Sequence, residues 1–183
     1  AVTGGSVRLH NVPVEEMLAV IAKLEEMGCV ISRQENSLAL HGPERLSAFA
    51  QLQTQPHPGF PTDMQAQMMA IASLAKGTSV VVENVFENRF AHAGDLNRMG
   101  ANILINGRTA VIRGVERLSG AHVTARDLRG GAALAIAGLA AQGETVVERA
   151  RLIDRGYERF ETALTHLGAD IQRISVERGE EHP

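Results

Sequence analysis

The chain has 183 residues, of which 44% are hydrophobic, and a formal net charge of -3. It is long enough for one sizeable domain or two small ones. Its Lys and Arg residues are scattered, which argues against a nucleic-acid-binding stripe and a basic membrane-binding face. The longest apolar run, "AALAIAGLAA", is about half the length of a membrane-spanning helix, so we expect a soluble, cytoplasmic protein.

The sequence gives no sign of a disulfide or a metal site. Cys29 is the single cysteine and has no metal-ligand companion at CxxC spacing. The seven histidines include no HxxxH or HxH pair. Aromatic residues make up 3% of the chain, which predicts an aliphatic, alanine-rich core with closely packed elements.

The first part of the chain, residues 1–54, is predicted to contain only part of a repeated unit. A helix that ends before Gly28 is expected between a first strand and a strand pair that turns near Asn36. The predicted strands cover 6–12, 29–34 and 37–43, and the helix covers 13–27.

Residues 55–124 form the most complete unit, with a helix, a strand, a second helix and two strands, and we expect a leading strand before them. The first helix should carry Met64, Met68, Ile71 and Leu74 on one face. The last two strands should form a hairpin that turns at Asn106-Gly107. The expected elements cover 63–76, 78–85, 88–99, 101–107 and 108–115.

Residues 125–183 repeat this order. Helices are predicted over 127–143 and 154–167, and strands over 144–150 and 169–176. The alanine-rich first helix is expected to be surrounded by protein on all sides. The chain then ends soon after the last predicted strand.

Internal repetition supports this division into three units. Three helices end in similar Gly-containing segments, which read "LEEMGCVI", "LNRMGANI" and "LTHLGADI". Other matching segments recur at offsets of 72 and 66 residues, which is the sign of one fold unit used several times. We therefore predict an α/β fold of the α+β type, built from pseudo-threefold βαβαββ repeats whose helices pack inward, with the first repeat incomplete.

Asp63 has two possible roles, which the sequence leaves open. Thr62 and Gln65 have the spacing of a capping box, and a carboxylate at the first helical position is favoured by the helix dipole. The functional alternative is a base at the mouth of a site, where it accepts a hydroxyl proton. The helix N-terminus would lower its pKa, and desolvation by a substrate would have to oppose that effect.

Three arginines stand where a helix is expected to begin. Arg89 and Arg155 are related by the 66-residue offset, and Arg129 follows Asp127 by two residues. A cation in the first turn opposes the helix dipole, although ion pairing at the surface is an alternative explanation for each. Together they predict a receptor for a small polyanionic ligand, with Asp63 and Asp127 beside it.

Four segments carry a resemblance to a known family: "FPTDMQAQ" from Phe60, "VFENRF" from Val85, "RLSGAHVTARDLRGGAAL" from Arg117 and "IDRGYERF" from Ile153. They resemble the C-terminal part of the carboxyvinyltransferases that act on UDP-N-acetylglucosamine, within the enolpyruvyl transferase family. The resemblance covers most of the chain in one register. The shikimate-pathway synthase of the same family is the competing interpretation.

The resemblance implies the inside-out barrel globule of this family, without metal or organic cofactor. The implied reaction transfers enolpyruvyl from phosphoenolpyruvate to the 3'-hydroxyl of UDP-N-acetylglucosamine and releases phosphate. By similarity, Asp63 takes the hydroxyl proton and Asp127 assists proton movement. The backbone of Val85 would contact the nucleotide sugar, and the three arginines would hold phosphoenolpyruvate: Arg89, Arg129 and Arg155.

The resemblance also implies what is absent. A Lys-Asn pair and a mobile loop with a reactive Cys or Asp belong to the family's other globule and have no counterpart here, so we expect the chain to need that N-terminal globule. Cys29 is not that loop residue, because it follows Gly28 as Ala101 follows Gly100. A non-catalytic ligand-binding module of the same fold is the alternative to an enzyme half.

Overall fold

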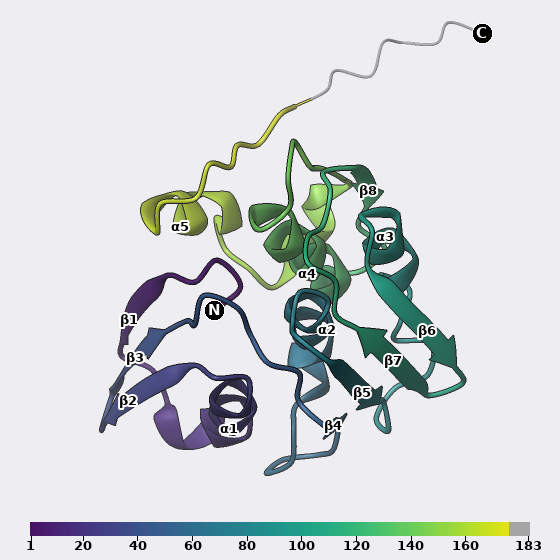
Figure 1. The fold of residues 1–183 in the computed structure, drawn as a ribbon. Helices are drawn as coiled ribbons and strands as arrows, with labels where there is room; N and C mark the ends of the chain where they lie inside the picture. The colour runs from purple at the N-terminus through teal and green to yellow at the C-terminus, as the bar shows by residue number, and fades with distance from the viewer. Residues whose placement is uncertain (176–183) are drawn as a thin grey trace, which may run out of the picture.

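The fold is described from a computed structural model, which covers residues 1–175 with a defined placement. Three small sheets and five α-helices make up this part of the chain. Figure 1 shows α2 (Gln65–Ala72) and α4 (Leu128–Leu139) in the middle, between the sheet that contains β1 and the sheet that contains β5. The mixed α/β architecture with inward helices confirms the predicted fold class.

The first unit contains one antiparallel sheet in the order β1-β3-β2. Its hairpin places Gln34 opposite Ser37, so that residues 35 and 36 form the turn, as predicted. A 3₁₀ helix leads directly into α1. The bounds are β1 (Ser6–His10), η1 (Val14–Met17), α1 (Leu18–Glu26), β2 (Val30–Gln34) and β3 (Ser37–His41).

The second unit contains a four-stranded sheet in the order β4-β5-β7-β6. Asn106 pairs with Thr109, so the hairpin turn is Gly107-Arg108, one residue later than predicted. Gly107 adopts a φ of 56°, which glycine tolerates without steric cost. The bounds are β4 (Gln51–Gln53), η2 (Thr62–Met64), β5 (Thr78–Val82), α3 (Ala93–Arg98), β6 (Asn102–Asn106) and β7 (Thr109–Arg113).

The third unit is the smallest in sheet content. Its bounds are β8 (His122–Thr124), β9 (Val146–Glu148), η3 (Ala150–Arg155) and α5 (Phe160–His166), together with α4. The strand predicted over 169–176 is wrong for residues 169–175, and residue 176 lies outside the described part. In the other two units the corresponding strand pairs with a central strand, β3 or β7, and residues 1–175 contain no equivalent partner.

Both predicted second helices begin later than the sequence pattern suggests. Helix α3 begins at Ala93 instead of residue 88, and α5 begins at Phe160 instead of residue 154. Asn88 and Arg159 have left-handed backbones, with φ of 56° and 48°. Because a right-handed helix cannot run through such a residue, the helical pattern is interrupted at both points.

The three repeated helix ends are confirmed in detail. Gly28, Gly100 and Gly168 have φ values of 95°, 95° and 93°. The N–H that follows each glycine donates to the carbonyl of an equivalent leucine at 3.0 to 3.1 Å; these leucines are Leu24, Leu96 and Leu164. Such a bond satisfies helix carbonyls that have no partner within the helix. The repeat is therefore present in the backbone as well as in the sequence.

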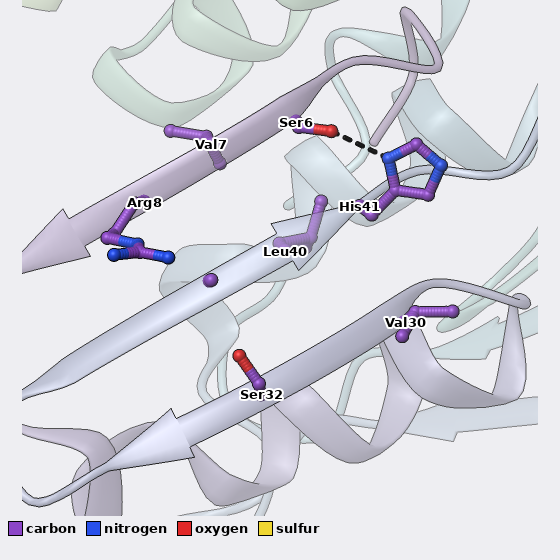
Figure 2. Close-up of a pocket in the computed structure, with 8 residues that line it drawn as sticks. Ser6, Val7, Arg8, Val30, Ser32, Leu40 and His41 are labelled. Carbon is purple, nitrogen blue, oxygen red and sulfur yellow. Dashed lines mark hydrogen bonds between the residues drawn. The ribbon is translucent and has the colours of Figure 1, made fainter.

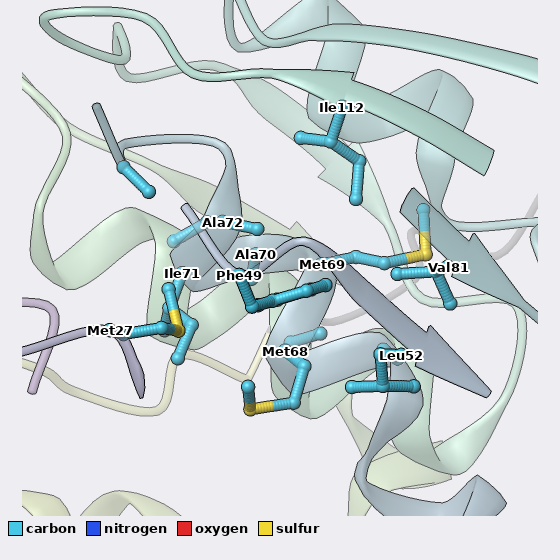
Figure 3. Close-up of a cluster of buried hydrophobic side chains, with 14 of the residues drawn as sticks. Met27, Phe49, Leu52, Met68, Met69, Ala70, Ile71, Ala72, Val81 and Ile112 are labelled. Carbon is cyan, nitrogen blue, oxygen red and sulfur yellow. The ribbon is translucent and has the colours of Figure 1, made fainter. Parts of the chain in front are cut away.

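The core lies around α2 and α4, which pack against each other. Every residue of α2 is buried, so burial is not confined to the face predicted to carry Met68 and Ile71. The α-helix ends at Ala72, earlier than the predicted residue 76. Figure 3 shows Met68, Met69 and Ile71 of α2 among buried side chains from neighbouring strands and loops, including Phe49 and Leu52. Helix α4 is buried along most of its length, as predicted. None of the helices within residues 1–175 is both long and apolar enough to cross a membrane.

A short leading strand precedes the second and third units. Strand β4 pairs in parallel with β5, and β8 pairs in parallel with β9. Strand β4 thus lies within the predicted range 1–54 but pairs with the second unit. Strand β8 lies within the predicted range 55–124 but pairs with the third unit. The division at residues 54 and 124 remains a prediction.

Gly114 and Gly94 allow a matched test of how closely the backbone segments of this fold approach one another. A Cβ at Gly114 would lie 1.6 Å from the carbonyl oxygen of Ala75, whereas a Cβ at Gly94 would meet no atom within 4 Å. We expect Gly114→Ala to lower the free energy of unfolding by about 3 kcal/mol, because the backbone must move. Gly94→Ala, inside α3, should raise it by up to about 1 kcal/mol. Urea denaturation measures both changes, and equal stability of the two variants would contradict the packing described.

Candidate functional site

Asp63 lies between two arginines that come from different parts of the chain. Arg89 Nη2 donates to Asp63 Oδ1 at 2.9 Å, and Arg129 Nη2 donates to Asp63 Oδ2 at 2.6 Å. The arginine side chains are 23% and 22% exposed, and that of Asp63 is 53% exposed. The structure therefore brings three of the six predicted site residues into direct contact at a partly open surface.

The ion pairs determine the protonation state of Asp63. The hydrogen bond from Arg129 lowers the pKa of Asp63, and the charges of both arginines add to this effect, while partial burial opposes it. A carboxylate with a lowered pKa is a weak base. Asp63 is therefore held ionised and neutralised by its partners in this state of the site.

Aromatic rings support both guanidinium groups. The Cζ of Arg89 lies 5.0 Å from the ring centre of Phe86, and that of Arg129 lies 5.2 Å from the ring centre of Tyr157. Gln67 Nε2 donates to the Tyr157 hydroxyl at 2.7 Å, which ties the ring to α2. A planar cation stacked on a ring loses less freedom when it binds a planar anion.

The capping box predicted at the start of α2 is wrong. Thr62 Oγ1 donates to Glu83 Oε2 at 2.9 Å, and Gln65 Nε2 donates to Met69 Sδ at 3.0 Å. Neither side chain reaches the backbone of the first turn, which is a 3₁₀ helix without a side-chain cap. The local spacing gave the wrong partner because Thr62 is bonded to a residue 21 positions away.

Asp127 lies at the start of α4, beside the cluster. It is the N-cap residue, and its Oδ1 accepts the Gly130 N–H at 2.8 Å. Arg129 is the second residue of the same helix. The first turn of α4 thus presents a carboxylate and the guanidinium that reaches Asp63.

Among the described residues, Arg155 and Val85 form no hydrogen bond or ion pair with Asp63, Arg89 or Arg129. Arg155 ends η3, which packs against α4, and its exposed side chain makes no hydrogen bond or ion pair within residues 1–175. Val85 is 37% exposed. Its N–H donates to Glu83 Oε1 at 2.9 Å, so its carbonyl is the backbone group left to meet a ligand.

The prediction that all three arginines begin helices is correct only for Arg129. Arg89 lies four residues before α3, and Arg155 lies at the end of η3, five residues before α5. The left-handed residue Asn88 immediately precedes Arg89, and the left-handed residue Arg159 lies between Arg155 and α5. Helix dipoles therefore do not assemble this group of cations.

Sequence reasoning missed Glu83, which is 1% exposed. Burial alone would raise the pKa of Glu83, but hydrogen bonds from Thr54, Thr62 and two backbone N–H groups outweigh burial and lower it. Its position was the available signal, because a charged residue directly after the apolar run "VVV" lies where a strand ends and a loop begins.

His92 was also missed. It is 2% exposed, and neither ring nitrogen has a hydrogen-bond partner within the described residues. A Cβ on Gly130, in the first turn of α4, would lie 3.1 Å from His92 Cβ. Burial lowers the pKa of His92 to about 4, and the charge of Asp127 opposes this shift. A neutral imidazole therefore packs directly under the start of α4.

A separate hollow lies on the face of the first sheet. Figure 2 shows Ser6, Arg8 and Ser32 on this face, with a hydrogen bond of 2.6 Å between Ser6 Oγ and His41 Nδ1. No carboxylate within residues 1–175 orients His41 as the third member of a triad would. The Ser6–His41 pair thus lacks the third member of a Ser-His-Asp triad among the described residues.

The described residues contain no group of three or more His, Cys, Asp or Glu side chains suited to hold a metal ion. Cys29 is buried, and burial raises the pKa of its thiol. It is thus a core residue, in agreement with its predicted place in the repeat.

Comparisons with known proteins agree with one another. The profile of the family described as EPSP synthase (3-phosphoshikimate 1-carboxyvinyltransferase) matches residues 1–164. The chain is 53% identical over 173 residues to the UDP-N-acetylglucosamine 1-carboxyvinyltransferase of Myxococcus xanthus. It is also 53% identical over 173 residues to UDP-N-acetylglucosamine 1-carboxyvinyltransferase 1 of Caldanaerobacter subterraneus. Each match covers 94% of this chain and 41% of the relative, so the chain spans about two fifths of their length.

Solved structures share the fold at low sequence identity. The enolpyruvyl transferase NikO from Streptomyces tendae has a TM-score of 0.83 and is 23% identical, over 93% of this chain and 42% of that chain. The EPSP synthase from Acinetobacter baumannii has a TM-score of 0.58 and is 22% identical, over 79% of this chain and 35% of that chain.

The buried imidazole predicts a particular pH dependence of stability. Above its unfolded pKa of 6.5, His92 is neutral in both states and contributes nothing. As the pH falls from 6.5 towards 4, only the unfolded chain takes up the proton, so the folded state loses stability. When the pH is lowered from 7.5 to 4.5, the free energy of unfolding of His92→Leu should rise by about 2 kcal/mol relative to that of the wild type. Urea denaturation at both pH values checks this, and a stability difference that is independent of pH would refute the lowered pKa.

Proposed function

The chain belongs to the EPSP synthase (3-phosphoshikimate 1-carboxyvinyltransferase) family, and on that premise we propose that it is part of a UDP-N-acetylglucosamine 1-carboxyvinyltransferase. In the proposed addition, the 3'-hydroxyl oxygen of the nucleotide sugar loses its proton and bonds to C2 of phosphoenolpyruvate, while the electron pair of the C2–C3 double bond takes up a proton at C3. Elimination then breaks the bond between C2 and the phosphate oxygen and removes a proton from C3. The double bond is restored, and the products are the enolpyruvyl ether and inorganic phosphate.

The observation that carries the proposal is the Asp63 carboxylate held between Arg89 and Arg129. A base beside two cations suits a reaction in which a hydroxyl attacks a doubly anionic substrate. The choice of nucleotide sugar is supported by two relatives that are 53% identical and carry that name.

The same ion pairs suggest how Asp63 becomes a stronger base. The phosphate and carboxylate of phosphoenolpyruvate are better bidentate partners for the arginines than a half-exposed Asp63. When they bind Arg89 and Arg129, Asp63 loses the donors that lower its pKa. A bound substrate also desolvates the carboxylate, which raises the pKa further. The order of events would thus link anion binding to proton removal.

The remaining predicted residues take supporting roles in this proposal. Arg155 is exposed at the end of η3 and has no competing partner among the described residues, so it is free to bind phosphoenolpyruvate. The Val85 carbonyl would meet the nucleotide sugar, since its N–H is already used. Asp127 would assist proton movement with its Oδ2, because Oδ1 caps α4.

The proposal includes a second globule and a cellular setting. The chain spans about two fifths of the length of its relatives, and the cluster of Asp63, Arg89 and Arg129 is partly exposed. We propose that an N-terminal globule of the same enzyme closes the site in the cytoplasm. The product would be the first committed precursor of peptidoglycan, and no metal or organic cofactor takes part.

Two other functions are less well supported. A transferase that uses 3-phosphoshikimate is named by the family description, but the solved EPSP synthase is only 22% identical. A non-catalytic binding module would have no use for an aspartate between the anion-binding arginines. Phosphate release with each acceptor in turn distinguishes the three functions.

The base role of Asp63 predicts a large kinetic effect with a small structural one. In the full-length transferase, Asp63→Ala should lower kcat by about 100-fold or more. The free energy of unfolding should change by less than about 1 kcal/mol, since Asp63 is half exposed and its ion pairs contribute little. Steady-state phosphate release and thermal denaturation measure the two effects. A loss confined to the melting temperature would return Asp63 to a helix-start role.

The need for a second globule predicts the behaviour of the chain alone. The purified 183-residue chain should release no phosphate from phosphoenolpyruvate plus UDP-N-acetylglucosamine, because half of the site is absent. The full-length protein, assayed in parallel at the same concentration, serves as the positive control. Turnover by the isolated chain would contradict the proposed division of the site.

A further inference from the structure

Glu83 is a buried carboxylate without a cation in contact. It is 1% exposed, and within residues 1–175 it forms no ion pair. Burial of an isolated charge is costly unless several donors satisfy it. Four hydrogen bonds supply those donors here, and they come from three separate segments of the chain.

One carboxylate oxygen holds the segment that carries Asp63. Oε2 of Glu83 accepts the Thr62 hydroxyl at 2.9 Å. Thr62 is the residue immediately before Asp63, and both lie in η2. Since η2 has no side-chain cap, this bond ties the entrance of the helix to a buried group.

The other oxygen holds the loop that leads to Arg89. Oε1 of Glu83 accepts the N–H groups of Val85 and Phe86 at 2.9 and 3.0 Å, and the Thr54 hydroxyl at 2.7 Å. Thr54 in turn accepts the Asn84 N–H at 2.9 Å. The N–H groups of Val85 and Phe86 therefore donate to the carboxylate itself, and that of Asn84 donates to a side chain bonded to it, so that three consecutive N–H groups tie the loop to this cluster.

These contacts close a ring through the candidate site. From Glu83 one path runs through Thr62 to Asp63, and the other runs through Phe86, whose ring lies under Arg89, back to Asp63. Asp63 is half exposed, and exposed ion pairs are weak and loosely held on their own. The buried part of the ring, at Glu83, gives them a fixed point of support.

We propose that Glu83 is a positioning residue that holds the Asp63 carboxylate and the Arg89 guanidinium in place for the reaction. The inference rests on the proposed function for the reaction that this geometry serves. Glu83 does not touch the substrate in this role, and it acts only through the two segments that it joins.

The kinetic test uses the full-length transferase and a double-mutant cycle. Glu83→Ala should lower kcat by about 30-fold per folded molecule, since small misplacements of a catalytic group are costly. In an Asp63→Ala background the same change should lower kcat by less than about threefold, because the group that it positions is gone. An equal fall in both backgrounds would show a purely structural role and overturn the proposal.

Three further variants make the cycle specific. Glu83→Gln keeps the side-chain shape and one acceptor oxygen, and it should recover kcat to within about fivefold of the wild type. Thr62→Val removes only the donor next to Asp63, so it tests the same link if Glu83→Ala does not fold. Glu35→Ala is the control, since it removes an exposed carboxylate in the β2–β3 turn that makes no side-chain hydrogen bond or ion pair within residues 1–175; it should leave kcat unchanged.

A spectroscopic arm separates failure of this inference from failure of the proposed function. If the wild type releases no phosphate, the proposed function fails, while the guanidinium N–H resonances of Arg89 in a ¹H–¹⁵N spectrum still report its bond to Asp63. Glu83→Ala should shift these resonances in the same direction as Asp63→Ala, and Glu35→Ala should not shift them. Wild-type resonances in the Glu83→Ala spectrum would overturn the positioning role.

Discussion

The close approach of α2 and α4 is the constraint on which the site depends. Helix α2 is buried throughout and α4 along most of its length, and the small residues of α4 allow the two helices to pack against each other. Their first turns then lie near each other, which lets Asp63, just before α2, reach Arg129, 66 residues later. The ion pair at the surface is thus a consequence of apolar packing in the core.

Around this helix pair, charge is organised in two layers. The outer layer contains Asp63 and its arginines, which remain partly exposed, and the proposed function requires these arginines to exchange Asp63 for an anion. Beneath it lie Glu83 and His92, which are almost completely buried and differ in charge: Glu83 is satisfied by four donors, and His92 stays neutral. A rigid lower layer is what allows an exposed ion pair to have a defined geometry.

The sequence predicted those features that depend on local patterns. The Gly28, Gly100 and Gly168 helix ends, all predicted strands except that over 169–176, and the buried character of α4 were visible in periodicity and glycine placement. The predicted starts of α3 and α5 were wrong because the left-handed backbones of Asn88 and Arg159 leave no mark on a hydrophobic pattern. The capping box failed because its threonine is bonded to a distant carboxylate. Glu83 and His92 were missed since their burial is decided by tertiary packing. Arg89 and Arg129 were singled out as cations at expected helix starts, and Asp63 by its place in a segment that resembles a known family.

The 66-residue offset between Asp63 and Arg129 is the same as the offset between the matching segments of the second and third units. The two residues therefore occupy corresponding positions, related by the internal pseudo-symmetry of the fold. Identical copies would carry like charges at this point and would repel each other across the pseudo-axis. The attractive pair is possible because the second and third units differ at this position, with Asp63 in one and Arg129 in the other. The candidate site thus lies where the two repeats are chemically different.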